Sequence, residues 1–443
     1  MNPDLSAPRP PFRRLLAGPL LVFLLTAAAD AQEPVPEPTS TAWPQWGGPE
    51  RDFSVPARPL ARGWPEDGPP KLWSRPLGAG HSGIASDGDT VYTLFRRGEA
   101  EVTVALSASD GAQMWSREHP AALWQGFNAQ FGEGPHTTPL IEGDALYTVD
   151  VRGVARKWNR HTGEVRWSLD LWQQLDGEPT DRGYASSPLA HGGRIVLPVP
   201  GNAACLVAID GETGRVAWKS GKSPNGAFSS PIVANVGGME QIVAFMAQEI
   251  VGLDPDDGTI HWRHPHPTKY GINAMTPVWG RDNLLFVSAA YDSGSRMLRF
   301  IRDGARTPLQ ELWAQRKMKI HHGSALRLGR VIVGSSGDFG PAFLTGLDAY
   351  SGELLFRQRG FAKANLLAVG DRILILDEDG VLALARLGGE GLEILERSQV
   401  LRSLSWAAPA LVGTTLFLRD QREVLALDLS PPGAGEAYSA DPP

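Results

Sequence analysis

The sequence holds one cysteine, Cys205, so no disulfide can form within the chain. Its formal net charge is −7, and no run of lysine or arginine outside the first residues offsets it. The electropositive face that nucleic-acid binding requires is therefore missing, and we expect no nucleic-acid partner. The apolar run at residues 15–29 is about 15 residues long, whereas a membrane-spanning helix needs about 20. No later run is long enough, so an integral membrane protein is not expected.

The first residues have the features of an export signal. Three arginines precede the apolar run, which ends in the small-x-small triplet ADA at residues 29–31. We expect a cleaved signal peptide at 1–31, a proline-rich leader at 32–42 and a periplasmic or secreted protein. The alternative is a retained signal anchor. No cysteine follows the apolar run directly, so no lipoprotein anchor is predicted.

Glycine (50) and proline (36) are abundant, which is typical of a chain with many tight turns between short strands. Four segments align without gaps around a glycine and a tryptophan four residues later. They are 105–115 (ALSASDGAQMW), 157–167 (KWNRHTGEVRW), 208–218 (AIDGETGRVAW) and 252–262 (GLDPDDGTIHW). A fifth segment, 346–356 (GLDAYSGELLF), keeps the pattern with phenylalanine in place of tryptophan. The chain is therefore built from repeats.

The aromatic position recurs at intervals of 38 to 52 residues between Trp73 and Ile394. A period near 45 residues fits a four-stranded propeller blade. Each ring is predicted to cover the seam to the next blade, because a large flat side chain on the outer strand can bury on the order of 200 Å² there. The predicted docking residues are Trp73, Trp115, Trp167, Trp218, Trp262, Trp313 and Phe356, with Ile394 at the same place in a degraded copy.

These repeats predict an all-β fold, an eight-bladed β-propeller of four-stranded antiparallel blades. The strand at 424–429 has no following tryptophan, and the strand at 71–77 has no blade before it. Pairing the two completes the eighth blade and removes the last open sheet edge. Seven blades remain possible if a degraded copy is an insertion. We expect one propeller domain at 43–430 and a disordered tail at 431–443.

The consensus A-x-D-x-x-T-G-x-x-x-W resembles the tryptophan-docking motif of the pyrroloquinoline-quinone (PQQ) propeller superfamily. The opening segment 43–52 (WPQWGGPERD) resembles the start of bacterial PQQ-binding-like β-propeller repeat proteins, a group similar to the propeller subunit of the outer-membrane assembly machine. Segments 317–323 (KMKIHHG) and 418–421 (LRDQ) are similar to parts of that group. The superfamily holds both dehydrogenases and non-catalytic scaffolds, so the resemblance implies the fold and leaves the function open.

Two functions compete on these grounds. The first is a non-catalytic, exported scaffold, a monomeric ring that binds envelope proteins, peptides or polymers, with no cofactor and no catalytic residue. The alternative is a PQQ-dependent dehydrogenase that oxidises an alcohol or sugar, with Ca²⁺ polarising the quinone. Resemblance to the large alcohol dehydrogenases would imply two neighbouring cysteines, and the chain has one. No convincing set of the roughly 6–8 oxygens that Ca²⁺ requires is found, so the scaffold is preferred.

The repeats also locate a candidate ligand site. Aligning the starts of the inner strands on the pattern x-Ser-Ser-Pro places one residue per blade at the mouth of the ring, and several are histidine or aromatic. With their polar neighbours, the predicted ligand-binding rim is His81, His136, Tyr184, Phe228, Asn273, His321, His322, Lys363, Trp406 and Arg419. The alternative is that these residues merely line a wet channel, which is polar in any propeller.

No metal site is predicted among the rim histidines. We expect His81, His136 and His322 to face one another across a wide channel. His321 and His322 are adjacent, and on an extended strand their side chains would point to opposite sides, so they could not readily chelate one ion. The segment 43–46, with its two tryptophans, is expected to pack over one propeller face.

Overall fold

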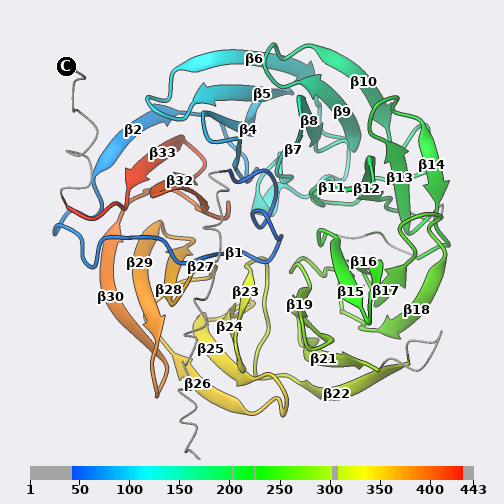
Figure 1. Cartoon of the computed structure of the whole chain (residues 1–443). Coiled ribbons are helices and arrows are strands. Elements are labelled where there is room, and N and C mark those ends of the chain that lie inside the picture. The colour runs from blue at the N-terminus through cyan, green and yellow to red at the C-terminus, as the bar shows by residue number, and fades with distance from the viewer. Residues whose placement is uncertain (1–41, 202–203, 224–225, 227, 302–307, 433–443) are drawn as a thin grey trace, which may run out of the picture. The chain divides into compact units, whose positions relative to one another are not determined.

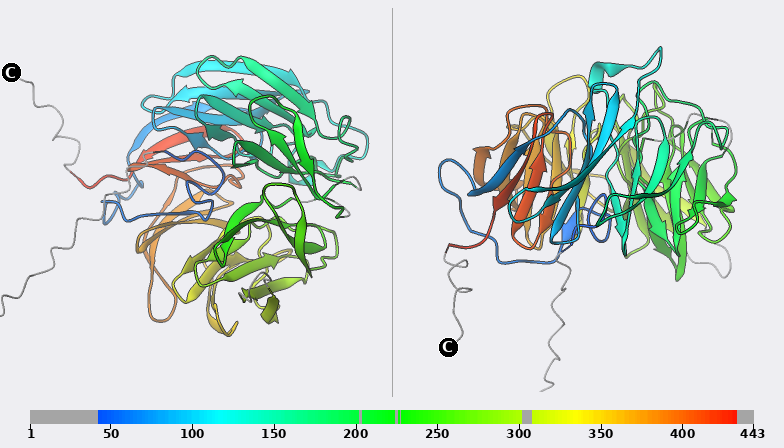
Figure 2. Two further views of the ribbon diagram at one scale, coloured as in Figure 1. Left: turned by 45° about the vertical axis from the view of Figure 1, so that its right-hand side comes forward. Right: turned by 90° about the horizontal axis from the view of Figure 1, so that it is seen from above.

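The computed structural model describes residues 42–432 except 202–203, 224–225, 227 and 302–307, and these residues belong to one compact unit, Ser40–Pro443. Eight sheets stand around a common axis, each with four antiparallel strands, and the sheet of blade 7 carries the short parallel strand β1 as a fifth (Figures 1 and 2). The predicted eight-bladed β-propeller is confirmed. The predicted signal peptide, most of the leader and nearly all of the C-terminal tail lie outside the described residues.

The strands follow the chain from the axis outward in each of the first four blades. Blade 1 consists of β3 (Ala85–Ser86), β4 (Thr90–Arg97), β5 (Ala100–Ser107) and β6 (Gln113–Pro120). Blade 2 consists of β7 (Leu140–Glu142), β8 (Ala145–Val149), β9 (Val154–Asn159) and β10 (Val165–Asp170). Blade 3 consists of β11 (Leu189–His191), β12 (Arg194–Pro198), β13 (Leu206–Asp210) and β14 (Val216–Lys219). Blade 4 consists of β15 (Ile232–Val236), β16 (Met239–Phe245), β17 (Glu249–Leu253) and β18 (Ile260–Pro265).

The second half of the ring repeats this order. Blade 5 consists of β19 (Val278–Gly280), β20 (Leu284–Ala289), β21 (Gly294–Phe300) and β22 (Leu309–Gln315). Blade 6 consists of β23 (Ala325–Leu328), β24 (Val331–Ser336), β25 (Phe343–Asp348) and β26 (Leu354–Gln358). Blade 7 consists of β27 (Ala364–Val369), β28 (Arg372–Asp377), β29 (Val381–Leu387) and β30 (Leu392–Gln399). Blade 8 contains β31 (Ala410–Val412), β32 (Thr415–Arg419) and β33 (Glu423–Asp428).

The ring closes in blade 8, where the two ends of the propeller meet. Strand β2 (Lys71–Pro76) pairs antiparallel with β33 as the outermost strand of that blade, and Trp73 lies opposite Ala426. In Figure 1 the two strands lie side by side although they come from opposite ends of the chain. This is the closure that the sequence predicts. Because β2 pairs with β33, the outer edge of β33 is not left open to solvent.

Each docking tryptophan lies at a β-bulge on the outermost strand, where its ring reaches the next blade. Trp218 pairs with Ala208 at such a bulge. Its Nε1 donates to the carbonyl of Pro255 in the turn of blade 4 at 3.1 Å, and its ring rests on Gly258, where an added Cβ would come within 2.5 Å of it. Gly258 has φ +74°, so it satisfies both a left-handed turn and the space that the ring needs. The repeated glycine and tryptophan therefore belong to one contact between successive blades.

The same indole-to-carbonyl hydrogen bond recurs around the ring. It links Trp73 to Ala108, Trp115 to Arg160, Trp167 to Gly211 and Trp313 to Ala349. Trp262 differs, because its Nε1 donates to Gln241 within its own blade at 2.8 Å. At these four seams and at that of Trp218, the aromatic repeat fixes the spacing of successive blades through one ring and one hydrogen bond.

Candidate functional site

Residues 43–55 run across the axis and contact the inner strands of several blades; we call them the central strap. Trp43 forms an isolated bridge with Ser86 of blade 1, and the carbonyl of Pro44 accepts a hydrogen bond from Ile141 of blade 2 at 2.8 Å. At its other end, β1 (Ser54–Val55) pairs parallel with β27 of blade 7. The central strap therefore binds the inner strands of blades 1, 2 and 7 through backbone hydrogen bonds.

Arg51 anchors the central strap between blades 3 and 4. Its guanidinium donates to the carbonyls of Pro231 at 3.0 Å and Pro188 at 2.8 Å, and more weakly to that of Ser187 at 3.4 Å. The side chain is buried, and burial lowers its pKa to about 9, so it remains charged at neutral pH. One cation therefore joins the loops that precede β11 and β15.

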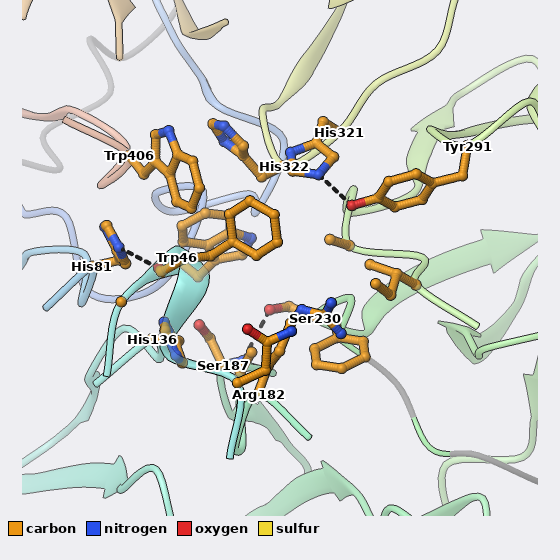
Figure 3. A pocket seen from close by; sticks show the side chains of 17 residues that line it. Trp46, His81, His136, Arg182, Ser187, Ser230, Tyr291, His321, His322 and Trp406 are labelled. Carbon is orange, nitrogen blue, oxygen red and sulfur yellow. Dashed lines mark hydrogen bonds between the residues drawn. The ribbon is translucent and has the colours of Figure 1, made fainter. Parts of the chain in front are cut away.

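A cavity of about 160 Å³ lies beside the central strap. Trp46 of the strap stands in the middle of the surrounding side chains, as Figure 3 shows. Its Nε1 donates to the Thr276 hydroxyl at 2.7 Å, and its ring packs edge-on against Phe53. The strap thus supplies the central part of the cavity wall.

Six of the ten predicted rim residues line this cavity together. They are His81, His136, Phe228, His321, His322 and Trp406. The rings are close: the centroids of His322 and Trp406 are 4.4 Å apart, and those of His81 and Trp406 are 4.9 Å apart. The inner-strand alignment therefore selected neighbouring side chains from the loops that lead into five different blades.

Two geometric expectations about the histidines are wrong. His81 and His136 do not face each other across a wide channel, because they belong to adjacent blades and their rings stack with centroids 5.8 Å apart. His321 and His322 lie in a bend before β23, not on an extended strand, and their rings are 5.2 Å apart on the same cavity. No group of three His, Cys, Asp or Glu residues in the described part of the chain is arranged to hold a metal ion.

The other four predicted rim residues lie outside the cavity wall and bind protein groups. Tyr184 donates to the carbonyl of Pro198 at 2.9 Å, and Asn273 donates to that of Met246 at 2.6 Å. Arg419 is buried and donates to the carbonyl of Gly80 at 3.1 Å. Lys363 forms an ion pair with Glu378 at 3.4 Å.

Several lining residues are absent from the predicted rim. Ser187 and Ser230 each hold the third position of an x-Ser-Ser-Pro pattern, two residues after the inner-strand start, and both line the cavity. Because extended side chains alternate, positions i and i+2 face the same way, so the pattern held this signal. Phe131 lies in η1 (Ala129–Phe131) between β6 and β7, and Tyr291 lies between β20 and β21. These loops are not part of the repeat, so the alignment could not find them.

The cavity histidines are uncharged at neutral pH. Burial lowers the pKa of His136 to about 4 and that of His321 to about 3. Burial, together with the nearby His136, also lowers the pKa of His81 well below its usual range. The amide nitrogen of Gln421 is 3.0 Å from His81 Nδ1, and His81 Nε2 is 2.9 Å from the carbonyl of Phe131. The same amide nitrogen is 2.8 Å from His81 Nε2, so His81 connects the η1 loop to blade 8.

Glu378 lies behind the aromatic wall and holds it in position. Its carboxylate accepts a hydrogen bond from Trp406 Nε1 at 2.8 Å and pairs with Lys363. Burial would raise the pKa of Glu378, but the adjacent His322, the Trp406 N–H and the Lys363 ammonium outweigh it and hold that pKa at about 2. The carboxylate orients Trp406 without lining the cavity.

Acidification below pH 6.5 is expected to destabilise the fold. Burial lowers the pKa of His119, His136, His266 and His321 to about 3 or 4, whereas a histidine in the unfolded chain titrates near 6.5. Below that pH the unfolded chain binds more protons, so stability is full above about 6.5 and falls as the pH drops. Burial raises the pKa of Glu101 to about 8 and also raises those of Asp150 and Asp377, which gives the opposite slope. Burial lowers the pKa of three more histidines, His81, His264 and His322, so the histidines outnumber these carboxyls.

The double variant His136→Gln/His321→Gln tests the share of the cavity in this effect. Each of the two histidines accounts for about 1 kcal/mol of the stability lost between pH 6.5 and 5.5, so we expect the double variant to lose about 2 kcal/mol less over that pH unit. Urea denaturation at the two pH values measures the slope, and comparing slopes cancels the packing lost in the variant. The exposed His161→Gln is the control. An unchanged slope in the double variant would contradict neutral cavity histidines.

The residues around the cavity do not fit PQQ with Ca²⁺, the pair that the resemblance of the repeats to the quinoprotein superfamily implies. Ca²⁺ takes about 6–8 oxygen ligands, mostly carboxylates and carbonyls. Within the described ranges no aspartate or glutamate lines the cavity, and Trp46 fills its centre. The wall also offers no carboxylate that could remove a substrate proton, so no redox step is derived through that cofactor.

Within the described residues, no helix has the length and apolarity to cross a membrane. A family model described as "Outer membrane protein assembly factor BamB" matches residues 98–302, which span β5 to β21. BamB from Moraxella catarrhalis is similar in structure, with a TM-score of 0.57 and 16% sequence identity, over 81% of this chain and 97% of that one. No curated protein matches the chain at a significant level by sequence.

A quinohemoprotein alcohol dehydrogenase from Comamonas testosteroni is also similar in structure. Its TM-score is 0.62 at 12% identity, and the match covers 88% of this chain and 81% of that one. The computationally designed Ika8 protein is similar over 81% of this chain and 99% of that one, with a TM-score of 0.56 and 12% identity. At such identities these structures show the fold alone. The chain is an eight-bladed β-propeller, and its segment from β5 to β21 is similar to the BamB family.

Proposed function

We propose that the chain is an exported, non-catalytic propeller that binds an envelope protein, peptide or polymer through the surface around the cavity. The similarity to BamB, described as an outer membrane protein assembly factor, supports an envelope role. So does the export signal that the first residues predict. A rigid ring suits this role, because loops on a stable scaffold can carry binding residues without taking part in folding.

The observation that carries this proposal is a continuous aromatic track from the surface into the cavity. Phe339 and Tyr270 have exposed fractions of 76% and 51%. The rings of both pack on Tyr291, with centroids 5.4 and 5.0 Å away. Tyr291 in turn shares a hydrogen bond of 2.6 Å with His321 of the cavity wall (Figure 3). Exposed aromatic side chains that lead to a buried pocket are typical of binding surfaces.

The alternative is a quinoprotein dehydrogenase, which the similarity to the alcohol dehydrogenase keeps as a candidate. The carboxylate-free wall and the single cysteine argue against it. Protein incubated with PQQ and Ca²⁺ is expected to show no dye-linked oxidation of alcohols or sugars. Sustained turnover above a protein-free control would contradict the scaffold function and support the dehydrogenase.

The binding surface itself is tested by crosslinking in the native envelope. A photoreactive phenylalanine analogue at Phe339 should crosslink to a discrete partner that mass spectrometry can identify. The same analogue at Met114, which is 57% exposed on the outer strand β6, is the matched control. Adding Tyr270→Ala should weaken the Phe339 product. Identical products at both positions, or none at Phe339, would count against this surface.

A further inference from the structure

The cavity has room for one small ring. Its volume of about 160 Å³ is close to the roughly 150 Å³ of an apolar protein cavity that binds benzene. Trp46, Trp406 and Phe228 supply aromatic walls, and the cavity histidines beside them are uncharged. A flat six-membered ring can pack on these faces, whereas a larger fused system would have to displace Trp46.

One side of the cavity carries hydrogen-bond donors that have no acceptor. Ser187 and Ser230 are 2% and 4% exposed, and both line the cavity. The Oγ of Ser187 accepts from the backbone N–H of Thr138, and that of Ser230 accepts from the N–H of Ser187, each at 2.9 Å. Each hydroxyl therefore keeps its own proton to donate, and within the described residues neither proton has a hydrogen-bond acceptor.

Arg182 adds a positive charge to the wall of the same cavity, and Figure 3 labels it with the two serines. One guanidinium nitrogen, Nη1, pairs with the exposed Asp181 at 2.7 Å, while Nε is buried and has no partner among the described residues. Arg51 adds a second buried cation under Ser187 and bonds to carbonyl oxygens and Gln45. With no carboxylate in the described wall, the donors and cations favour an anionic oxygen.

We propose that the cavity binds a carboxylate carried on a single six-membered ring. The ring packs between Trp46 and Trp406, and the carboxylate accepts hydrogen bonds from Ser187, Ser230 and Arg182. A planar carboxylate suits this set, because a guanidinium matches its two oxygens and the cavity leaves little room for a tetrahedral group. This inference rests on the proposed binding function and names the ligand class of the same site. An aromatic acid and a sugar acid share this chemistry.

Isothermal titration with benzoate, glucuronate and benzamide tests the proposal on the full chain. We expect one of the two carboxylates to bind at least tenfold more tightly than benzamide, the neutral isostere of benzoate. Preference for benzoate assigns the site to aromatic acids, and preference for glucuronate assigns it to sugar acids. Equal binding of benzoate and benzamide, or no binding of either carboxylate, overturns the proposal.

Arg182→Gln is the decisive variant, and Arg97→Gln, with a side chain 62% exposed on blade 1, is the charge-matched control. The first should weaken carboxylate binding at least tenfold and leave benzamide unaffected, and the second should change neither. If Arg182→Gln fails to fold, Ser230→Ala should give the same selective loss. Failure of these titrations leaves the crosslinking at Phe339 intact, and failure of that crosslinking leaves these titrations intact, so the two proposals fail separately.

Discussion

Replacing Arg51 with methionine is expected to destabilise the propeller by roughly 3–5 kcal/mol. The variant keeps the apolar stem of the side chain but removes the guanidinium, with its charge and all its donors. The carbonyls of Pro188, Ser187 and Pro231 then lose their partner inside the ring, and each buried acceptor left unpaired costs about 1–3 kcal/mol. Some of that cost is relieved when the loops relax, which keeps the total below the sum.

The loss should begin in the central strap. The strap holds Trp46 at the cavity through Thr276, so hydrogen exchange at residues 43–55 should accelerate more than exchange in the outer strands. Urea denaturation gives the global value. Arg97→Met is the control, because that side chain is 62% exposed and its loss should cost little. A change in the free energy of unfolding below about 1 kcal/mol in Arg51→Met would mean that the Arg51 hydrogen bonds contribute little to the stability of the propeller.

Trp218→Ala is expected to cost a similar 3–5 kcal/mol, the range for truncating a buried aromatic side chain. Trp218 is 8% exposed and lies in the apolar cluster between blades 3 and 4, which includes Leu253. Its removal opens a gap over Gly258 and leaves the Pro255 carbonyl without its donor. Both losses fall on the seam, so neighbouring blades should separate more easily.

Trp218→Phe divides that effect into its two parts. The phenyl ring keeps most of the contact with Gly258, and the lost indole hydrogen bond should cost about 1 kcal/mol. Phe356 already holds this position in blade 6, where it lies over Gly346 and near Gly391. Met114→Ala, on an exposed outer strand, is the control. Urea denaturation curves of the three variants measure these differences in stability. If Trp218→Ala is as stable as Met114→Ala, Trp218 has no docking role.

The Trp218 contact and the Arg51 contact lie at different distances from the axis of the ring. Trp218 and its equivalents join neighbouring blades at the outer strands, one seam at a time. Arg51 and the rest of the central strap join blades at the axis, where inner strands carry the loops that line the cavity. The outer contacts therefore determine the spacing of neighbouring blades. The inner contacts determine the positions of the loops that form the binding site.

The sequence by itself determined the number of blades, their closure and the docking role of the tryptophans. These follow from contacts between adjacent repeats: the glycine under Trp218 is only forty residues away in a repeated segment. It also located six residues of the cavity wall, because inner strands must begin near the axis. The tertiary structure alone decided which polar residues face the cavity.

Tyr184, Asn273 and Arg419 are residue types that are common in binding sites. In the structure their polar groups donate hydrogen bonds to backbone carbonyls. Nothing local distinguishes them from His81, because the partner of a side chain depends on loops that belong to no repeat. Trp46 reaches Thr276, and Gln421 reaches His81, across 230 and 340 residues. Such pairs form only when the ring closes, so the cavity and its donors emerge from the folded structure.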